Sequence, residues 1–348
     1  MYFLYYAGMA SNWTTEQIGL ALSDDGEVFH RYGADGMIIP IDPASDWKNL
    51  RVCNPHVLPV GNGYAMLYQG IAAANEASCI GLATSSDGFA WNCHAAPVLR
   101  GTQVQEIDSG LMHGSMASVI EPCVLEVENG YRLWFVYRHK SASGNAIYHA
   151  RSTDLVRWRV DPTPVLTGAA FPFGSIWYPQ VVREGSGFTM YVTVRSDSHA
   201  IYSLSSQDGL EFRDPFLITG EMWDTPRAAM SLKKSVAARR LAVRALGSYQ
   251  RMKQMILPRL GLERGVQGLA HAHLLPEVEG NRLYVHAYNL TAAGRRYMEI
   301  GQLSQTDKGQ WVNYRTSLSR SPNQNAWDSA FVADPFVISS NDPVPAIA

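Results

Sequence analysis

The chain has 348 residues, a formal net charge of −2 at pH 7, 46% hydrophobic residues and 17% charged residues. This composition is typical of a globular protein with a substantial core, and the near-neutral charge excludes the strong basic excess of a nucleic-acid-binding protein. No apolar run reaches the roughly 18 to 20 residues that a membrane-spanning helix needs, so we expect no membrane span.

The N-terminal segment 1–8 is apolar, but it is too short and uncharged for a secretion signal. Four cysteines (Cys53, Cys79, Cys93 and Cys123) show no metal-ligand spacing, and without a secretion signal we expect them to be reduced. The sequence therefore predicts a cytoplasmic protein with no metal centre and no cofactor.

One pattern recurs five times: an Ile, then Asp seven residues later, then Phe or Trp four residues after that. The copies are Ile18–Asp25–Phe29, Ile80–Asp87–Trp91, Ile147–Asp154–Trp158, Ile201–Asp208–Phe212 and Ile300–Asp307–Trp311. A fixed internal period is the signature of a repeat architecture. We expect the Asp residues to brace turns through their own backbone rather than to act in catalysis, and the aromatic residues to pack in the outer strand between repeats.

Each copy reads as four short strands. In the second copy, strand-forming runs cover 54–60, 64–70, 79–85 and 89–93, with Gly-containing turns between the first two and the last two. The same order can be followed in the third, fourth and fifth copies. Four-stranded units that recur about every 60 residues are typical of a β-propeller.

The two ends of the chain complete one unit. Residues 2–8 have the sequence of a second strand with no first strand before them, and Asp334-Pro-Phe-Val-Ile-Ser supplies the missing strand at the other end. We therefore predict an all-β, five-bladed β-propeller that forms a single domain over 1–348. Its first blade takes the inner strand from the C-terminus, which leaves no open sheet edge.

Residues 225–265 interrupt the repeat between the fourth and fifth blades. The stretch 227–264 carries ten Lys or Arg residues and one acid, Glu263. Apolar residues recur at helical spacing within 231–257, and Pro258 follows, so we expect a basic helical insertion. Three roles stay open: a surface helix packed on the propeller, a lid that offers cations to an anionic substrate, and a docking helix for a partner or a membrane surface.

The inner strands of a propeller converge on its axis, so the start of each inner strand and the end of each second strand meet around a central pocket. The inner-strand starts are Asp334, Asn54, Glu121, Tyr178 and His271; the neighbouring candidates are Trp177, Gln69, Arg138, His139, Arg195, His286 and Asn289. Burying carboxyl groups without compensation is costly, which indicates a functional pocket. The alternative is that these groups only hydrogen-bond one another and ordered water.

These residues carry a family resemblance. The starts Asp334-Pro-Phe-Val-Ile and Glu121-Pro-Cys-Val-Leu, the Tyr-rich second strands and the Ser-x-Asp-Gly-x-x-Trp turns resemble the five-bladed propeller glycosidases. These are the arabinanase/β-xylosidase group and the invertase/levansucrase group. The resemblance covers the whole chain apart from the insertion. It implies that Asp334 is a base or nucleophile, and that His271 lies near an axial water or ion.

The chain departs from the family pattern at the general acid. The resemblance implies acids in the third and fourth blades, where this chain has Glu121 and Tyr178. Glu121 thus takes the position of the assisting carboxylate, and Tyr178 takes that of the acid. Either Glu121 is itself the acid, or a loop carboxylate supplies the proton; the loop candidates are Glu106, Asp108 and Asp224.

Three functions follow from this pocket. The first is a carbohydrate-active enzyme that hydrolyses or transfers a glycosyl unit of a small-molecule or oligosaccharide substrate; Arg138 and Arg195 would contact hydroxyls or a carboxylate, and Trp177 or Tyr178 would stack on a sugar face. The second is a non-hydrolytic acid–base enzyme that carries out an elimination, cyclisation or isomerisation. The third is a non-catalytic glycan-binding propeller, for which Asn54 and Tyr178 in place of acids would be typical.

Overall fold

The computed structural model describes residues 1–11, 13–73, 77–107, 117–139, 145–171, 175–195, 199–218, 268–275, 281–290, 296–305, 311–323 and 325–339. Within these ranges the fold is all-β apart from the short helix α1 (Gly101–Ile107) and a single 3-10 turn (Gly168–Ala170). None of the described helices is long and apolar enough to cross a membrane. The predicted helical insertion at 225–265 lies outside the described residues.

Three of the sheets follow the chain order directly, with antiparallel neighbours. The first contains β10 (Ala117–Val127), β11 (Gly130–His139), β12 (Ala146–Ser152) and β13 (Arg159–Val160), with β14 (Leu166–Thr167) also paired to β12. The second contains β15 (Ile176–Glu184), β16 (Gly187–Arg195), β17 (His199–Ser206) and β18 (Arg213–Leu217). The third contains β19 (Gly268–Leu275), β20 (Arg282–Leu290), β21 (Arg296–Gln305) and β22 (Trp311–Leu318).

The remaining strands form one ten-stranded sheet. Its first half contains β23 (Phe331–Ser339), β1 (Tyr2–Met9) and β2 (Glu16–Ser23), with β3 (His30–Arg31) and β4 (Met37–Ile39) on β2. Its second half contains β5 (Arg51–Val60), β6 (Gly63–Ile71), β7 (Ser78–Ser85) and β8 (Asn92–Cys93), with β9 (Leu99–Arg100) on β7. A parallel pairing of Glu16 with Arg51 joins the halves. The pairing of the two chain ends is formed as predicted, with Tyr2 of β1 opposite Ser339 of β23.

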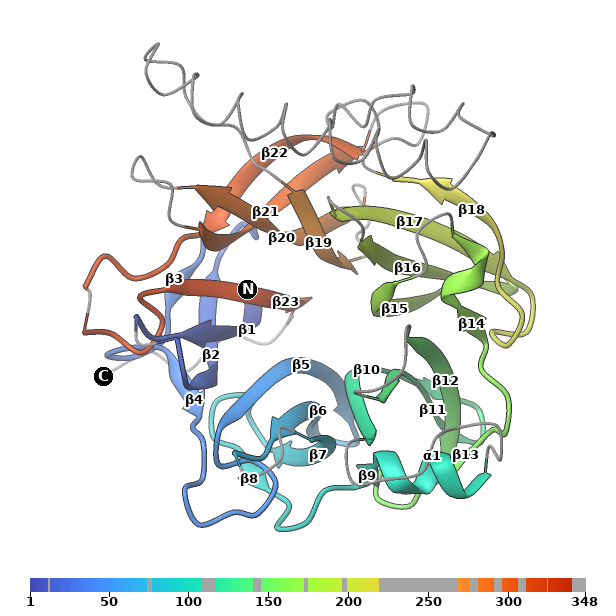
Figure 1. Cartoon of the computed structure of the whole chain (residues 1–348). Helices are drawn as coiled ribbons and strands as arrows, with labels where there is room; N and C mark the ends of the chain where they lie inside the picture. Colours follow the sequence, from blue (N-terminus) through green and yellow to red (C-terminus); the bar gives the residue numbers. More distant parts are fainter. Residues whose placement is uncertain are drawn as a thin grey trace, which may run out of the picture.

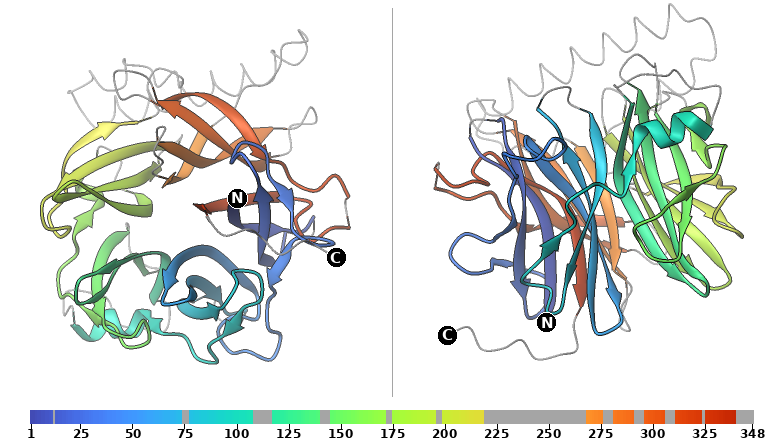
Figure 2. Two further views of the ribbon diagram at one scale, coloured as in Figure 1. Left: turned by 180° about the vertical axis from the view of Figure 1, so that it is seen from behind. Right: turned by 90° about the horizontal axis from the view of Figure 1, so that it is seen from below.

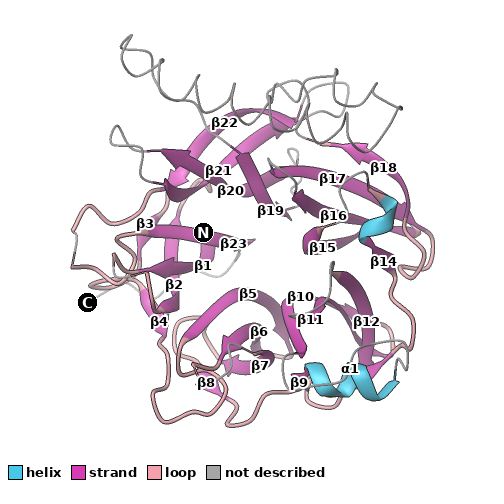
Figure 3. Ribbon diagram, in the orientation of Figure 1, coloured by secondary structure: helices cyan, strands magenta, loops and turns pink. Residues whose placement is uncertain are grey.

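The sheets stand around a common axis, which is consistent with a β-propeller. In Figure 1 the strands β23, β5, β10, β15 and β19 lie innermost, and the later strands of each sheet lie further out. Figure 2 shows the same ring from behind and from below, where most strands run roughly along the axis. Figure 3 shows that strands make up nearly all of the ring and that α1 lies at its rim.

The core lies between the faces of neighbouring sheets. One buried cluster joins Leu67 and Ile80 of β6 and β7 to Phe135 of β11. Another joins Leu4 of β1 to Tyr284 of β20, so the first and last sheets in the chain also share a core. Each fully buried side chain of this size stabilises the fold by about 1.5–3 kcal/mol relative to exposure. Packing between neighbouring sheets thus stabilises the ring, including where the first sheet meets the last.

The repeated Asp residues are turn braces in the four copies that are described. Asp25, Asp87, Asp154 and Asp208 each accept a bond from a Ser two residues before, at 2.9–3.1 Å. Each also accepts the backbone N–H two residues after, at 2.8–3.0 Å. The repeated aromatic residue lies just before or at the start of the fourth strand rather than within it. Asp307 lies outside the described residues.

Candidate functional site

The same backbone irregularity occurs once in each of the five innermost strands. The residues with positive φ there are Asn54 (51°), Glu121 (56°), Tyr178 (54°), His271 (51°) and Asp334 (54°). The pairing register of each strand shifts at that residue, which marks a β-bulge. A left-handed conformation in a non-glycine residue costs about 1–2 kcal/mol.

This geometry corrects the sequence prediction in one respect. The five residues do not start their strands: β5, for example, begins at Arg51, three residues before Asn54. Four of the five are followed by Pro, which has no backbone N–H. Pro is tolerated here because the bulge already interrupts the hydrogen bonding between the strands. A bulge redirects a side chain relative to the sheet. Its repetition around the ring places five different side chains at equivalent positions near the axis.

Four of these five side chains, all but that of His271, line a cavity of about 580 Å³, within the usual range for small-molecule sites. Of the residues predicted from the sequence, the cavity is lined by Asn54, Gln69, Glu121, Arg138, Trp177, Tyr178, His286 and Asp334. His271 reaches the site through its contacts with Asp334 and Tyr178, and Arg195 through Trp177. His139 and Asn289 end up near the ends of β11 and β20, and their side chains lie outside the description.

Asp334 is a buried carboxylate held by two histidines. The Nδ1 of His271 lies 3.1 Å from Asp334 Oδ1, and the Nδ1 of His286 lies 3.4 Å from the same oxygen. The backbone N–H of Asp334 donates to His286 Nδ1 at 3.3 Å. Burial alone would raise the pKa of Asp334, but its interactions with His271 and His286 outweigh burial and hold this pKa below its ordinary value. Burial also lowers the pKa of His286. Asp334 is therefore ionised at neutral pH.

Tyr178 belongs to an aromatic wall of the site. Its ring stacks on His271 with centroids 4.7 Å apart and meets His286 edge-on at 5.3 Å. The backbone N–H of Tyr178 donates a hydrogen bond to Glu121 Oε2 at 2.5 Å. The arrangement fixes the rings that position Asp334.

Glu121 is buried and protonated near neutral pH. Its pKa is raised to about 8: burial is the largest cause and the charge of Asp334 adds to it, whereas the Tyr178 N–H and the guanidinium groups of Arg195 and Arg138 act in the opposite direction. Glu121 is therefore a carboxyl group that holds a proton beside several groups that would stabilise its anion.

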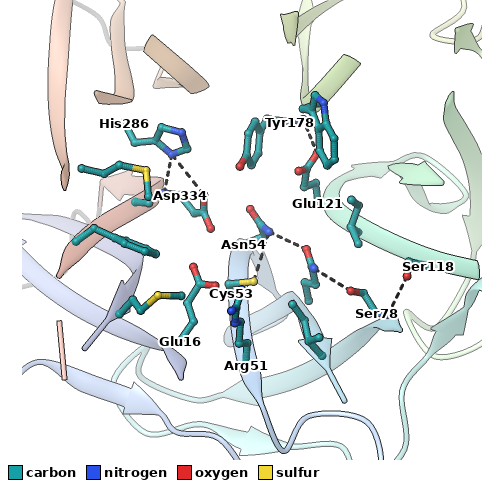
Figure 4. A pocket seen from close by; sticks show the side chains of 18 of the residues that line it. Glu16, Arg51, Cys53, Asn54, Ser78, Ser118, Glu121, Tyr178, His286 and Asp334 are labelled. Atoms are coloured by element: carbon teal, nitrogen blue, oxygen red, sulfur yellow. Dashed lines mark hydrogen bonds and ion pairs between the residues drawn. The ribbon is translucent and has the colours of Figure 1, made fainter. Parts of the chain in front are cut away.

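A third carboxyl group, Glu16, was missed by the sequence reasoning. It is the first residue of β2, it is buried, and it lines the cavity. One of its oxygens, the Sγ of Cys53 and an oxygen of Asp334 lie within 4.8 Å of one another. The pKa of Glu16 is raised to about 8: burial is the largest cause and the charge of Asp334 adds to it, whereas Arg51 and Cys53 act in the opposite direction. Figure 4 shows Glu16 and Asp334 pointing toward one another, with Glu121 across the site.

A signal for Glu16 was present in the repeat. It stands two residues before the repeated Ile18, and the equivalent residues before Ile80 and Ile300 are Ser78 and Met298. Ser78 and Met298 also line the cavity, so the starts of the third strands contribute to the site together with the inner strands. Among the loop candidates, Glu106 is exposed on α1 and does not line the cavity, whereas Asp108 and Asp224 lie outside the described residues.

A chain of hydrogen bonds supports one side of the cavity. Asn54 Nδ2 donates to Gln69 Oε1 at 2.8 Å, and Gln69 Nε2 donates to Ser78 Oγ at 3.1 Å. The Ser78 N–H then donates to Ser118 Oγ at 3.1 Å, which links two neighbouring sheets (Figure 4). The Oδ1 of Asn54 is buried and has no hydrogen-bond partner among the described residues. A buried acceptor left open in this way is suited to a ligand hydroxyl.

Two arginines flank an indole at the cavity. The guanidinium carbons of Arg195 and Arg138 lie 4.9 Å and 5.8 Å from the ring centroid of Trp177. Both arginines are exposed, and neither forms an ion pair within the described part of the chain. The site therefore offers an aromatic face with two cations beside it.

Two groups of three side chains come close enough together to hold a metal ion. In the first, the Nδ1 atoms of His271 and His286 lie close to the same oxygen of Asp334. In the second, Glu16 and Cys53 lie beside Asp334, and burial raises the pKa of both. Metal ligands must be deprotonated, so a metal in the second group would have to displace the protons of Glu16 and Cys53.

The fold is shared with solved glycoside hydrolases. An exo-1,5-α-L-arabinanase from a bovine ruminal metagenomic library is similar with a TM-score of 0.54 and 14% identity, over 90% of this chain and 92% of that one. A family-43 endo-arabinanase from Bacillus licheniformis gives 0.56 and 14%, over 89% and 92%. An endo-1,4-β-xylanase from Bacteroides thetaiotaomicron gives 0.54 and 14%, over 90% and 92%. No protein-family model and no curated protein matches the sequence. The resemblance to propeller glycosidases is confirmed for the fold.

Proposed function

We propose that this protein is a glycoside hydrolase with a five-bladed propeller scaffold. The observation that carries this proposal is the pairing of an ionised Asp334 with protonated glutamic acids in one cavity. Carboxyl groups whose surroundings push their pKa values apart provide the base and the acid of an acid–base mechanism. Glycosidic bond cleavage needs this combination of two carboxyl groups.

The five-bladed count is part of the proposal. The ten-stranded sheet consists of two halves of five strands each, connected by one joining pair, and the positive-φ bulge occurs once in each of the five inner strands. With the pairing of β23 and β1, we infer a ring of five blades in one domain.

Each side chain has a role in this proposal. Asp334 acts as base or nucleophile at the anomeric carbon, and a protonated glutamic acid donates to the leaving oxygen. His271 and His286 keep Asp334 ionised. Asn54 Oδ1 accepts a sugar hydroxyl, since it lacks a protein partner among the described residues. Trp177 offers a face on which a sugar ring stacks.

The test is a screen of aryl glycosides. Because the similar structures include arabinanases and a xylanase, 4-nitrophenyl arabinosides and xylosides come first, followed by hexosides and uronides. We expect release of nitrophenol from at least one glycoside, with loss of that release in Asp334→Asn. A chain that hydrolyses none of these, or whose turnover survives Asp334→Asn, would contradict the proposal.

One observation favours a second candidate. The ring position at which the family pattern has its acid is occupied by Tyr178, whose ring is stacked on His271. A non-hydrolytic acid–base enzyme would use Asp334 as a base and a glutamic acid as an acid without activating water. Turnover of a sugar-derived intermediate without consumption of water would support this candidate.

A further inference from the structure

We propose that Glu16 is the proton donor of this enzyme and Asp334 its nucleophile, so that the sugar product keeps the anomeric configuration of the substrate. This inference rests on the proposed glycosidase function and assigns roles within the same site. The general acid that the inner strands lack is then supplied by β2, the third strand of the first blade.

Separation is the first reason. An oxygen of Glu16 and an oxygen of Asp334 lie within 4.8 Å of one another. Carboxyl groups about 5–5.5 Å apart characterise retaining glycosidases, whereas inverting enzymes keep them about 6.5–9.5 Å apart to admit a water molecule. Both side chains line the same cavity and point into it (Figure 4). The limit between these closest oxygens is thus nearer to the retaining separation than to the inverting one.

The surroundings of Glu121 suit a different task. Its Oε2 already accepts the 2.5 Å bond from the Tyr178 N–H, and Arg195 and Arg138 stabilise its anion. These groups resist use of that oxygen as a donor. The groups that face Glu16 are Asp334 from β23 and Arg51 and Cys53 from β5. The anion whose charge raises the pKa of Glu16 is thus its proposed catalytic partner.

The first step is a displacement. A lone pair of the Asp334 carboxylate forms a bond to the anomeric carbon while the bond from that carbon to the leaving oxygen breaks. The electron pair of the broken bond stays on the leaving oxygen, which takes the proton of Glu16. The products are a glycosyl ester on Asp334, a free alcohol and the Glu16 carboxylate.

The second step reverses these roles. Water gives its proton to the Glu16 carboxylate, and its oxygen attacks the anomeric carbon. The ester bond breaks and its electron pair returns to Asp334. Two displacements at one carbon restore the original configuration, and the sum is hydrolysis of one glycosidic bond.

Because Asp334 lies close to Glu16, the charge of Asp334 changes the pKa of Glu16 as each step requires. While Asp334 is an anion, its charge helps Glu16 to keep a proton. Once Asp334 is an ester that charge is gone, so Glu16 becomes the stronger acid and remains ionised to receive a proton from water. The return of charge to Asp334 then favours protonation of Glu16 again.

The experiment uses the whole chain and the glycoside found by the screen. Proton NMR of the wild-type reaction follows the anomeric configuration of the first product. Glu16→Gln and Glu121→Gln are then compared on a 2,4-dinitrophenyl glycoside, whose leaving group needs no proton, and on a methyl glycoside, whose leaving group does. Azide is added as an alternative nucleophile, and thermal unfolding checks that each variant is folded.

We expect the wild type to give the retained anomer. We expect Glu16→Gln to lose roughly 10²–10⁴-fold on the methyl glycoside but far less in the first step on the dinitrophenyl glycoside. Azide should accelerate Glu16→Gln and yield a glycosyl azide of retained configuration. Glu121→Gln should lose activity on both substrates equally and should not respond to azide.

An inverted first product would overturn the inference even if neither variant folds, since it needs only the wild type. The inference would also be overturned if Glu121→Gln, and not Glu16→Gln, showed the dependence on the leaving group and the acceleration by azide. In both cases the glycosidase function would stand. Failure of the wild type on every glycoside would instead remove the proposed function on which the inference rests.

Discussion

The molecule repeats two backbone features around its ring, and they differ in how they use side chains. In the outer turns the repeated side chain is the same: Asp25, Asp87, Asp154 and Asp208 make equivalent bonds. In the inner bulges the backbone is the same but the side chain changes at every copy: Asn, Glu, Tyr, His and Asp.

This contrast separates residues that build the fold from residues that act in the site. A turn brace satisfies its own backbone, so one residue type serves in every copy. A bulge only sets a direction, so five copies can present five chemistries to one cavity. The bulges also hold about 1–2 kcal/mol of conformational strain each, which the packed sheets on either side must offset.

The largest expected effect separates two aspartates. Asp334→Asn should lower turnover by roughly 10²–10⁴-fold, because the variant lacks the ionised carboxylate. Asp87→Asn should leave turnover unchanged, because the amide oxygen of the new side chain can still accept the turn bonds and Asp87 lies outside the cavity. Steady-state kinetics on the same glycoside measures both. Equal losses of turnover in the two variants would show that the turn aspartates and the bulge aspartate do not differ in function.

The next effect is on the pH dependence of stability. Glu16 and Glu121 each have a folded-state pKa of about 8 against an ordinary value of 4.5, so the folded state binds more protons than the unfolded state between these limits. The free energy of unfolding should therefore fall as pH rises from about 4.5 to about 8, with a slope of up to ~1.4 kcal/mol per pH unit for each group.

Urea unfolding at pH 5, 6, 7 and 8 tests this slope. Glu16→Gln and Glu121→Gln should each reduce it, since amides do not titrate. An exposed pair offers the control: Glu211→Gln, which removes the surface contact with Arg213, should leave the slope as in the wild type. If the free energy of unfolding of the wild type does not change over this pH range, the pKa values of the two carboxyl groups are not raised in the folded state.

A smaller effect is expected at the turns. Asp87→Ala should lower the free energy of unfolding by about 1 kcal/mol, since the Phe89 and Ala90 N–H groups lose their acceptor but remain exposed to water. Asp208→Ala should behave alike because its bonds are equivalent. Urea midpoints measure both, and turnover per folded molecule should not change. A loss of turnover in either variant would place the turns in the site.

The sequence was sufficient for the features that recur and insufficient for those that occur once. The repeated Ile, Asp and aromatic residues predicted the four-stranded units, because these follow from local strand and turn propensities. The pairing of β23 with β1 was predicted because the first unit lacks an inner strand at the N-terminus. The sequence also indicated the axial residues, of which Asp334 and Glu121 line the cavity. It did not indicate Glu16, which differs from its repeat equivalents Ser78 and Met298. Its proximity to Asp334 depends on how two strands from opposite ends of the chain are placed.

The smallest expected effect concerns how the neighbours of a bulge residue set its chemistry. Arg195 and Arg138 both lower the pKa of Glu121, and the contribution of Arg195 is the larger. Arg195→Gln should therefore raise the pKa of Glu121 more than Arg138→Gln does, since each substitution removes a cation that stabilises the carboxylate. Carbon-13 NMR of the glutamate carboxyl groups, with the Glu121 signal assigned by its loss in Glu121→Gln, measures the titration. Arg213→Gln, which changes an exposed cation paired with Glu211, should leave it unmoved. If the order of the two arginines is reversed, the guanidinium that packs more closely on Trp177 is not the one that acts more strongly on Glu121. The cations would then act on the bulge residue independently of their packing on the indole.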